Sequence, residues 1–414
     1  MLQINLTFMN TYHLIIALSI IIVLSFLFNI LAKRTNFPSV LLLISLGIGV
    51  KAVMSYLGTE LDFFPILEAL GVVGLIMIVL EAALDLELKK EKRKLIVKSM
   101  IVAFLGLIMS SLLISFIIQG MISNVDFLTS LIYAIPLSIM SSAIIIPSVV
   151  NLSEDKREFM IYESTFSDIF GIMFFYYVLG NVDSHGFKEV IFHVSANLVS
   201  TIAISLLLGY IMVWGLQSLR TKTKFFLILA ILILLYAIGK LMHISSLLII
   251  LIFGLILNNR KIFFRGRLSK LISNSGIVRL LDDFKMFTAE TSFLVRTFFF
   301  VFFGMSLSLN TFKGGQVWIL SFLILVALFG IRLLLIKSVL RKNIFPKVWL
   351  APRGLITILL FYAIPEEFQL EEFKAGVLFI VIIFTALVMA ISLMMEKRHS
   401  AEHDKMEETL PIEQ

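Results

Sequence analysis

The chain has 414 residues, of which 59% are apolar and only 15% are charged. An average soluble protein has about 25% charged residues, so this composition excludes an ordinary cytosolic domain. The chain contains no cysteine, which excludes disulfides, iron–sulfur clusters, zinc–thiolate sites and thiol catalysis. The net charge of +7 comes from basic residues concentrated in one set of loops. We interpret this excess as a signal of membrane topology, and we expect no nucleic-acid partner.

A helix that crosses a membrane needs about 20 mostly apolar residues. Thirteen segments meet or approach that length, which predicts an all-α polytopic membrane protein. The first run has no preceding basic stretch and no small-residue cleavage site, so we expect a retained helix rather than a signal peptide. The second, ninth and twelfth segments are short, as is typical of transporters. The predicted spans are 11–32, 39–56, 65–84, 95–119, 127–150, 159–180, 189–217, 224–240, 244–258, 284–309, 316–340, 347–364 and 374–396.

Basic residues are distributed unevenly between the two sets of alternate loops. One set, with its flanking helix ends, carries 25 Lys and Arg residues, whereas the other carries 4. Basic loops stay in the cytoplasm of membrane proteins. We therefore predict that residues 1–10 are extracellular and that residues 397–414 form a cytoplasmic tail.

Two short spans resemble each other. Residues 37–48 align with residues 244–255, so that Gly47 falls on Gly254. The two segments are seven spans apart and cross in opposite directions, which indicates an inverted-topology repeat. The alternative is chance, because Leu- and Ile-rich helices resemble one another.

The sixth span contains the run Glu163-Ser164-Thr165-Phe166-Ser167-Asp168, with Asp168 well inside its apolar part. An Asp near the centre of a transmembrane helix costs about 2.5–3.5 kcal/mol, and such residues usually mark an ion or proton path. Burial disfavours the charged form of a carboxyl group, so Asp168 can hold either a proton or a metal cation. Ser164, one turn earlier, offers an oxygen ligand, and Ser167 can orient the site. The alternative is an Asp168 neutralised by a structural salt bridge.

Other ionisable residues also lie within apolar spans. Glu163 lies about 140° around the helix from Asp168, so the two carboxylates face different neighbours. Arg332 needs a partner in the eleventh span, and one hypothesis is a buried Glu163–Arg332 pair that fixes two helices. Arg296 either pairs with Glu290 or extends toward the end of its helix. We interpret the acidic residues that end the third span as a solvated helix end, with a cytoplasmic cation funnel as the alternative: Glu81, Asp85 and Glu87.

Two spans contain residues that interrupt helices. The fifth span contains Ser138, Ser141, Ser142 and Pro147, and the twelfth contains Ala351-Pro352-Arg353-Gly354. Interrupted membrane helices are tolerated where their free backbone groups line a cavity. Breaks in corresponding spans of two repeats predict a binding site where they cross near the bilayer midplane. Arg353 would offset the half-helix dipoles there, and Ser141 and Ser142 would offer oxygen ligands.

These residues resemble those of the monovalent cation:proton antiporter superfamily, in particular its Na⁺/H⁺-exchanger-like branch. The run 163–168 resembles the family's Glu-Ser-x-x-Asn-Asp helix, Arg353-Gly354 resembles its Arg-Gly helix, and residues 298–307 resemble its Phe-rich Gly-Met segment. The resemblance implies six core helices that move against a dimerisation scaffold, an ion carried by Asp168 and a Glu163–Arg332 pair. Two positions depart from the family: Ser167 replaces Asn, and Met140-Ser141-Ser142 replaces Thr-Asp-Pro.

We therefore predict a homodimeric antiporter of the plasma membrane that exchanges Na⁺ or K⁺ for H⁺ and uses no cofactor. Because Asp168 has no second Asp beside it in the core, we predict electroneutral exchange. The membrane domain is expected to comprise residues 11–396, with scaffold helices at 11–84 and 189–309 and core helices at 95–180 and 316–396. One alternative is a channel-like or regulatory relative that does not exchange ions. A membrane enzyme is disfavoured because the loops between the predicted spans are too short to house a donor site.

Overall fold

The computed structural model describes residues 11–35, 38–56, 64–88, 91–180, 203–215, 224–241, 246–264, 274–307, 312–341, 344–370 and 372–409. Within these ranges the regular elements are helices, and no strand occurs. They follow the chain as α1 (Thr11–Thr35), α2 (Ser39–Tyr56), α3 (Phe64–Asp85), α4 (Arg93–Met121), α5 (Phe127–Ser138), α6 (Ser142–Ser148), α7 (Glu154–Gly180), a helix at Ala203–Gly215, α9 (Lys224–Leu241), α10 (Ser246–Asn258), α11 (Arg260–Phe263), α12 (Asn274–Ser306), α13 (Gly315–Leu340), α14 (Leu355–Tyr362) and α15 (Ala375–Thr409).

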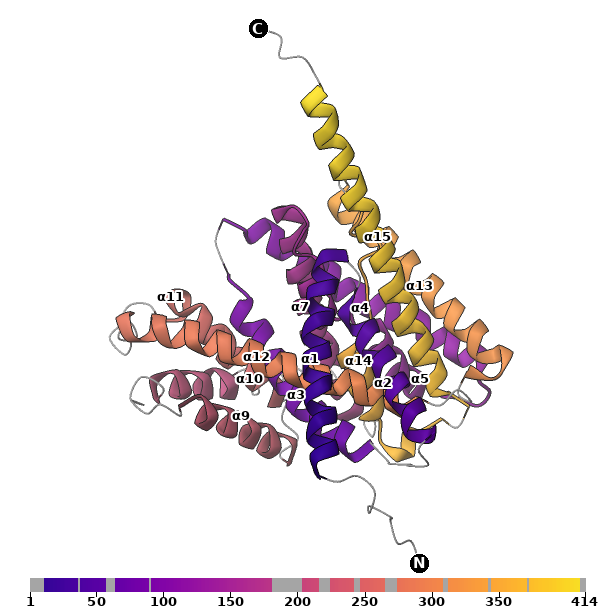
Figure 1. Ribbon diagram of the computed structural model, residues 1–414, viewed down its shortest axis with the longest axis horizontal. Helices are drawn as coiled ribbons and strands as arrows, with labels where there is room; N and C mark the ends of the chain where they lie inside the picture. Colours follow the sequence, from indigo (N-terminus) through magenta and orange to yellow (C-terminus); the bar gives the residue numbers. More distant parts are fainter. Residues whose placement is uncertain are drawn as a thin grey trace, which may run out of the picture.

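The all-helical membrane fold predicted from the sequence is confirmed, with differences at several boundaries. In the described part of the chain, six helices are long and apolar enough to cross a membrane, and four shorter apolar helices accompany them. The fifth predicted span is divided into α5 and α6, and α12 begins ten residues before the predicted start at residue 284. Helix α15 continues past residue 396 to Thr409 and projects beyond the other helices (Figure 1). Residues 1–10 and 189–202 lie outside the described residues.

The helices pack in two groups. One group contains α2, α3, α10 and α12, with α9 packed against α10. The other contains α4, α5, α7, α13 and α15. In Figure 1, α9, α10 and α12 lie on one side of the molecule and α13 and α15 on the other. Helix α14 contacts both α5 and α3, so the boundary between the groups runs beside it.

The first group contains two helix pairs that the predicted inverted repeat would relate to each other. Helix α2 packs against α12, and α10 packs against α3. If α2 corresponds to α10 and α3 to α12 in the inverted repeat, then the α2–α12 pair corresponds to the α10–α3 pair. Glycines allow close contact in both pairs, because Gly47 faces Gly304 in one and Gly254 faces Ala83 in the other. Small residues at helix interfaces let membrane helices approach closely, where dispersion contacts hold them together.

Replacing Gly47 with Ala is expected to destabilise the α2–α12 pair. The new methyl group would overlap the carbonyl oxygen of Val301 and lie 3.0 Å from the Cα atom of Gly304, both of them backbone atoms that cannot rotate away. Overpacking of this kind costs about 1–3 kcal/mol. We expect a lower apparent melting temperature in detergent. Gly49→Ala on the same helix is the control, since a methyl group there meets no atom within 4 Å. Equal melting temperatures for the two variants would contradict this packing.

Candidate functional site

An interrupted helix and a non-helical segment that leads into a short helix meet at the centre of the site. Helix α5 ends at Ser138 and α6 begins at Ser142, with extended backbone at Ile139 and Ser141. A second non-helical segment, at residues 350–354, precedes α14. The two breaks are joined directly, because the backbone N–H of Ser141 donates to the carbonyl of Pro352 at 2.9 Å.

The position of the first break corrects the sequence interpretation. Pro147 lies inside α6, and a second proline, Pro136, lies inside α5, so neither proline is at the break. Side chains of α7 accept two of the freed backbone N–H groups instead. The N–H of Met140 donates to Ser167 Oγ at 2.9 Å, and the N–H of Ser142 donates to Asp168 Oδ2 at 3.0 Å. These bonds replace the helical bonds that the break removes.

Asp168 is buried beside the break, with 4% of its surface exposed. Its Oδ2 atom accepts the Ser142 bond, whereas its Oδ1 atom has no partner among the described residues. The same is true of the Ser141 and Ser142 hydroxyl oxygens, which are also buried. Buried polar atoms normally have partners. The unpartnered Asp168 Oδ1 atom is therefore suited to bind a small cation, a proton or a water molecule, and the two serine hydroxyls are further candidate ligands.

A small cavity adjoins Asp168 at the boundary between the two helix groups. Its walls come from α3, α7, α10 and α14. The lining residues are Ile78, Val79, Ala82, Thr165, Asp168, Ile169, Leu251 and Ile356. Asp168 supplies the single carboxylate of this lining.

Arg353 supports the crossing from the other broken segment. Its side chain is buried, and its Nε and Nη1 atoms donate to the carbonyls of Leu137 and Ala351, each at 2.8 Å. Leu137 lies in the last turn of α5, where helix carbonyls carry partial negative charge, so the guanidinium offsets the end of that half-helix. Gly354 next to it lets the two breaks approach closely, because a methyl group there would lie 2.7 Å from Ile144 Cδ1 and 2.8 Å from Ser141 Oγ.

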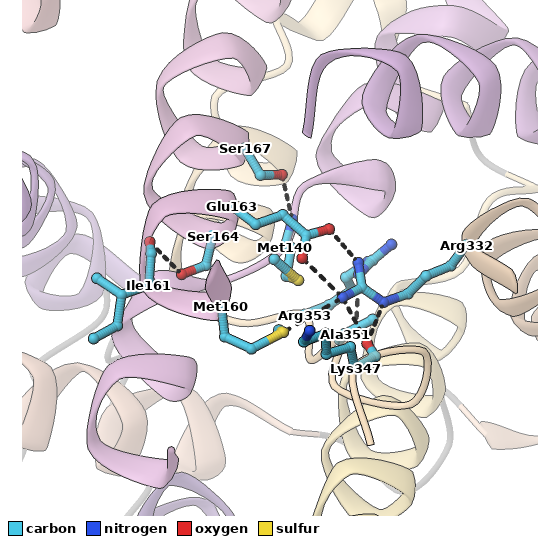
Figure 2. Close-up of polar contacts among 10 residues, drawn as sticks. All are labelled: Met140, Met160, Ile161, Glu163, Ser164, Ser167, Arg332, Lys347, Ala351 and Arg353. Carbon is cyan, nitrogen blue, oxygen red and sulfur yellow. Dashed lines mark hydrogen bonds and ion pairs between the residues drawn. The ribbon is translucent and has the colours of Figure 1, made fainter. Parts of the chain in front are cut away.

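Glu163 and Arg332 form a bidentate ion pair on another face of α7. Arg332 Nη1 lies 2.6 Å from Glu163 Oε1, and Nη2 lies 3.0 Å from Oε2 (Figure 2). Arg332 also donates from Nε and Nη2 to the backbone carbonyl of Lys347, at 3.0 and 2.8 Å. Glu163 is only 2% exposed. The pair therefore links α7, α13 and the segment that leads into the second break.

Comparison with known proteins decides the family. A family model described as "Sodium/hydrogen exchanger, transmembrane" matches residues 2–396. The chain belongs to the sodium/hydrogen exchanger family. This confirms the resemblance seen in the sequence, and it makes the chain a membrane transporter of the cation/proton antiport class rather than an enzyme. The comparison with curated protein sequences gives no match.

Solved structures in the comparison show the same fold. The sodium proton antiporter MjNhaP1 from Methanocaldococcus jannaschii, in a structure at pH 8, is 20% identical with a TM-score of 0.66 over 92% of this chain and 98% of that one. An electron-microscopy map of MjNhaP1 gives 20% identity and a TM-score of 0.65 over 95% and 97% of the two chains.

The predicted serines of this exchanger-family chain take different places in the structure. Ser141 lies in the break, Ser142 is the first residue of α6, and Ser167 accepts a bond from the backbone N–H of Met140 in the break. The Ser164 hydroxyl donates to the carbonyl of Ile161 at 3.2 Å (Figure 2) and does not line the cavity beside Asp168. Its role as an ion ligand stays a prediction.

Two threonines were missed in the sequence. Thr165 lines the cavity with Asp168. Because Thr165 lies three residues before Asp168 on the same helix, the sequence could have indicated that the two side chains are neighbours. Thr385 accepts a bond from the backbone N–H of Arg353 at 3.0 Å. It lies in the uniformly apolar part of α15, where no motif distinguishes it.

The interpretation of Arg296 needs correction. Its Nη2 atom lies 3.5 Å from Glu81 Oε1 of α3, and both side chains are mostly buried. Glu290 points to the exposed surface of α12 instead. Glu81 is therefore an interior residue rather than part of a solvated helix end, because the close packing of α3 against α12 brings it to Arg296.

Proposed function

We propose that the chain exchanges one monovalent cation, Na⁺ or K⁺, for one proton, and that Asp168 binds the two alternately. The observation that carries this proposal is the buried Asp168 Oδ1 atom, which has no partner among the described residues, on a carboxylate whose other oxygen is held by the Ser142 backbone N–H. A proton satisfies that oxygen by a covalent bond, and a cation satisfies it by coordination. Because the two ligands need the same atom, binding of one excludes the other, and that exclusion is the basis of antiport.

The pathway follows the cavity at the boundary of the helix groups. We assign the scaffold to the group around α2, α3, α10 and α12, and the moving core to the group around α4, α5, α7 and α13. The position of Asp168 supports this division, since it belongs to one group and lines a cavity whose other walls include α3 and α10. Sliding of one group past the other would expose Asp168 to each side of the membrane in turn.

The stoichiometry follows from the charges around the site. Asp168 is the single carboxylate of the cavity lining, and Glu163 is held by Arg332. One carboxylate accepts one proton or one monovalent cation, so the exchange is electroneutral. The family description names sodium. Potassium remains in the proposal because Met140-Ser141-Ser142 brings no second acidic residue to the break. We further propose a homodimer in the plasma membrane, with the N-terminus outside and the basic loops inside.

Purified protein in liposomes with a preset pH gradient tests the exchange. Addition of Na⁺ or K⁺ is expected to dissipate the gradient, measured with a pH-sensitive dye, whereas choline chloride should have no effect. The rate should not change when the membrane potential is clamped, because no net charge moves. Lack of a response to Na⁺, K⁺ and Li⁺ would reject exchange and favour a channel-like or regulatory role. A rate that depends on the clamp would reject electroneutrality.

A further inference from the structure

We propose that Thr165 is a cation ligand on the cavity side of Asp168 and determines how well the cation competes with the proton. This inference rests on the function proposed for Asp168. Thr165 and Asp168 are the two polar members of the cavity lining, and the other lining side chains are apolar. A cation that reaches Asp168 through this cavity therefore meets one other side-chain oxygen on the wall, the Thr165 hydroxyl.

Helix geometry places the two side chains together. Thr165 is three residues before Asp168, which puts it about 60° around the helix and about 4.5 Å along the axis. Residues at this spacing are neighbours on a helix surface. Thr165 and Asp168 are both almost fully buried, with 1% and 4% of their surfaces exposed. Burial means that a cation there has little bulk water to replace a missing ligand.

The neighbouring hydroxyls are differently placed. Ser164 also lies close to Asp168 along the helix, but its hydroxyl donates to the Ile161 carbonyl. Ser141 in the break and Ser142 at the start of α6 do not line this cavity. Thr165 is thus the hydroxyl-bearing residue that lines the cavity together with residues of α3 and α10.

The chemistry distinguishes the cation from the proton. Hard cations bind oxygen ligands and give up hydration water only when other oxygens replace it. A proton binds one carboxylate oxygen and needs no further oxygen ligands. Removal of the Thr165 hydroxyl should therefore weaken binding of the cation and leave the affinity of Asp168 for the proton nearly unchanged. The hydroxyl shifts the competition toward the cation.

Thr165→Val tests this inference, because valine has nearly the same shape and lacks the hydroxyl. In the liposome assay we expect the half-saturating cation concentration to rise about tenfold, equivalent to about 1.4 kcal/mol, with the maximal rate changed by less than about twofold. Thr165→Ser restores the hydroxyl and should return the half-saturating concentration to near the wild-type value. Thr165→Ala should behave like Thr165→Val, and it serves as the second variant if the valine protein does not fold.

The matched control is Thr288→Val. Thr288 is fully buried in α12 and has no hydrogen-bond partner among the described residues, so the chemical change is the same away from the cavity. Its half-saturating concentration should equal that of the wild type. Unchanged values for both Thr165→Val and Thr165→Ala, or a serine variant as weak as the valine variant, would overturn the inference. Lack of exchange by the wild type would instead reject the proposed function.

Discussion

Replacement of Asp168 with Asn is expected to abolish cation-dependent proton movement. The carboxamide is neutral at every working pH, so it can neither release a proton nor balance the charge of a bound cation. Its size and its oxygen are retained, and that oxygen can still accept the bond from the Ser142 N–H, now 3.0 Å from Asp168 Oδ2. The variant should therefore fold and elute as a single species from a sizing column, while its rate in the liposome assay falls to that of empty liposomes.

The control for this variant is Asp155→Asn. Asp155 lies on the same helix, in the exposed first turn of α7, so the chemical change is identical outside the site. Exchange by this variant should match the wild type. Cation-dependent proton flux in the Asp168→Asn protein, above that of empty liposomes, would show that another group binds the ions.

The helical fold could be predicted because the membrane imposes it. With no water in the bilayer core, a chain must satisfy its backbone groups within helices or closed barrels, and long apolar runs therefore predict helices. The same reasoning predicts that a break must be held by other groups. It does not predict where the break lies. The first break lies at residues 139–141 because Ser167 and Asp168 of α7 accept the freed N–H groups. Those contacts join residues 26 and 27 positions apart.

The candidate site shows the limit of helical periodicity. Ser164 and Thr165 both fall within about 60° of Asp168 around α7, so spacing alone does not separate them. The helices packed against α7 determine which of the two residues lines the cavity beside Asp168. Thr165 lines the cavity shared with α3 and α14, whereas the Ser164 hydroxyl bonds to its own helix. In the same way, the sequence offers both Glu290 and Glu81 as ion-pair partners for Arg296, and the packing of α3 against α12 brings Glu81 to it. Contacts between helices are decided by tertiary packing, which a single sequence does not state.

Replacement of Arg332 with Ala is expected to cause a large loss of stability. Arg332 supplies both bonds to the Glu163 carboxylate and two more to the Lys347 carbonyl. Its removal leaves a carboxylate that is 2% exposed without its partner. Breaking a buried ion pair from one side costs about 3–5 kcal/mol. The folded yield from membranes should fall strongly, and the apparent melting temperature of the remaining protein should drop.

Two further variants separate charge from packing. Glu163→Gln combined with Arg332→Met removes both charges at similar volume, and it should recover much of the stability because no charge is left unpaired. Glu154→Ala breaks the pair of Glu154 with Lys92 at 3.4 Å, in which Glu154 is 73% exposed, and it should leave the melting temperature unchanged. A normal yield for Arg332→Ala would mean that the pair does not hold α7 to α13. Recovery in the double variant together with near wild-type exchange would show that Glu163 positions helices and does not carry the ion.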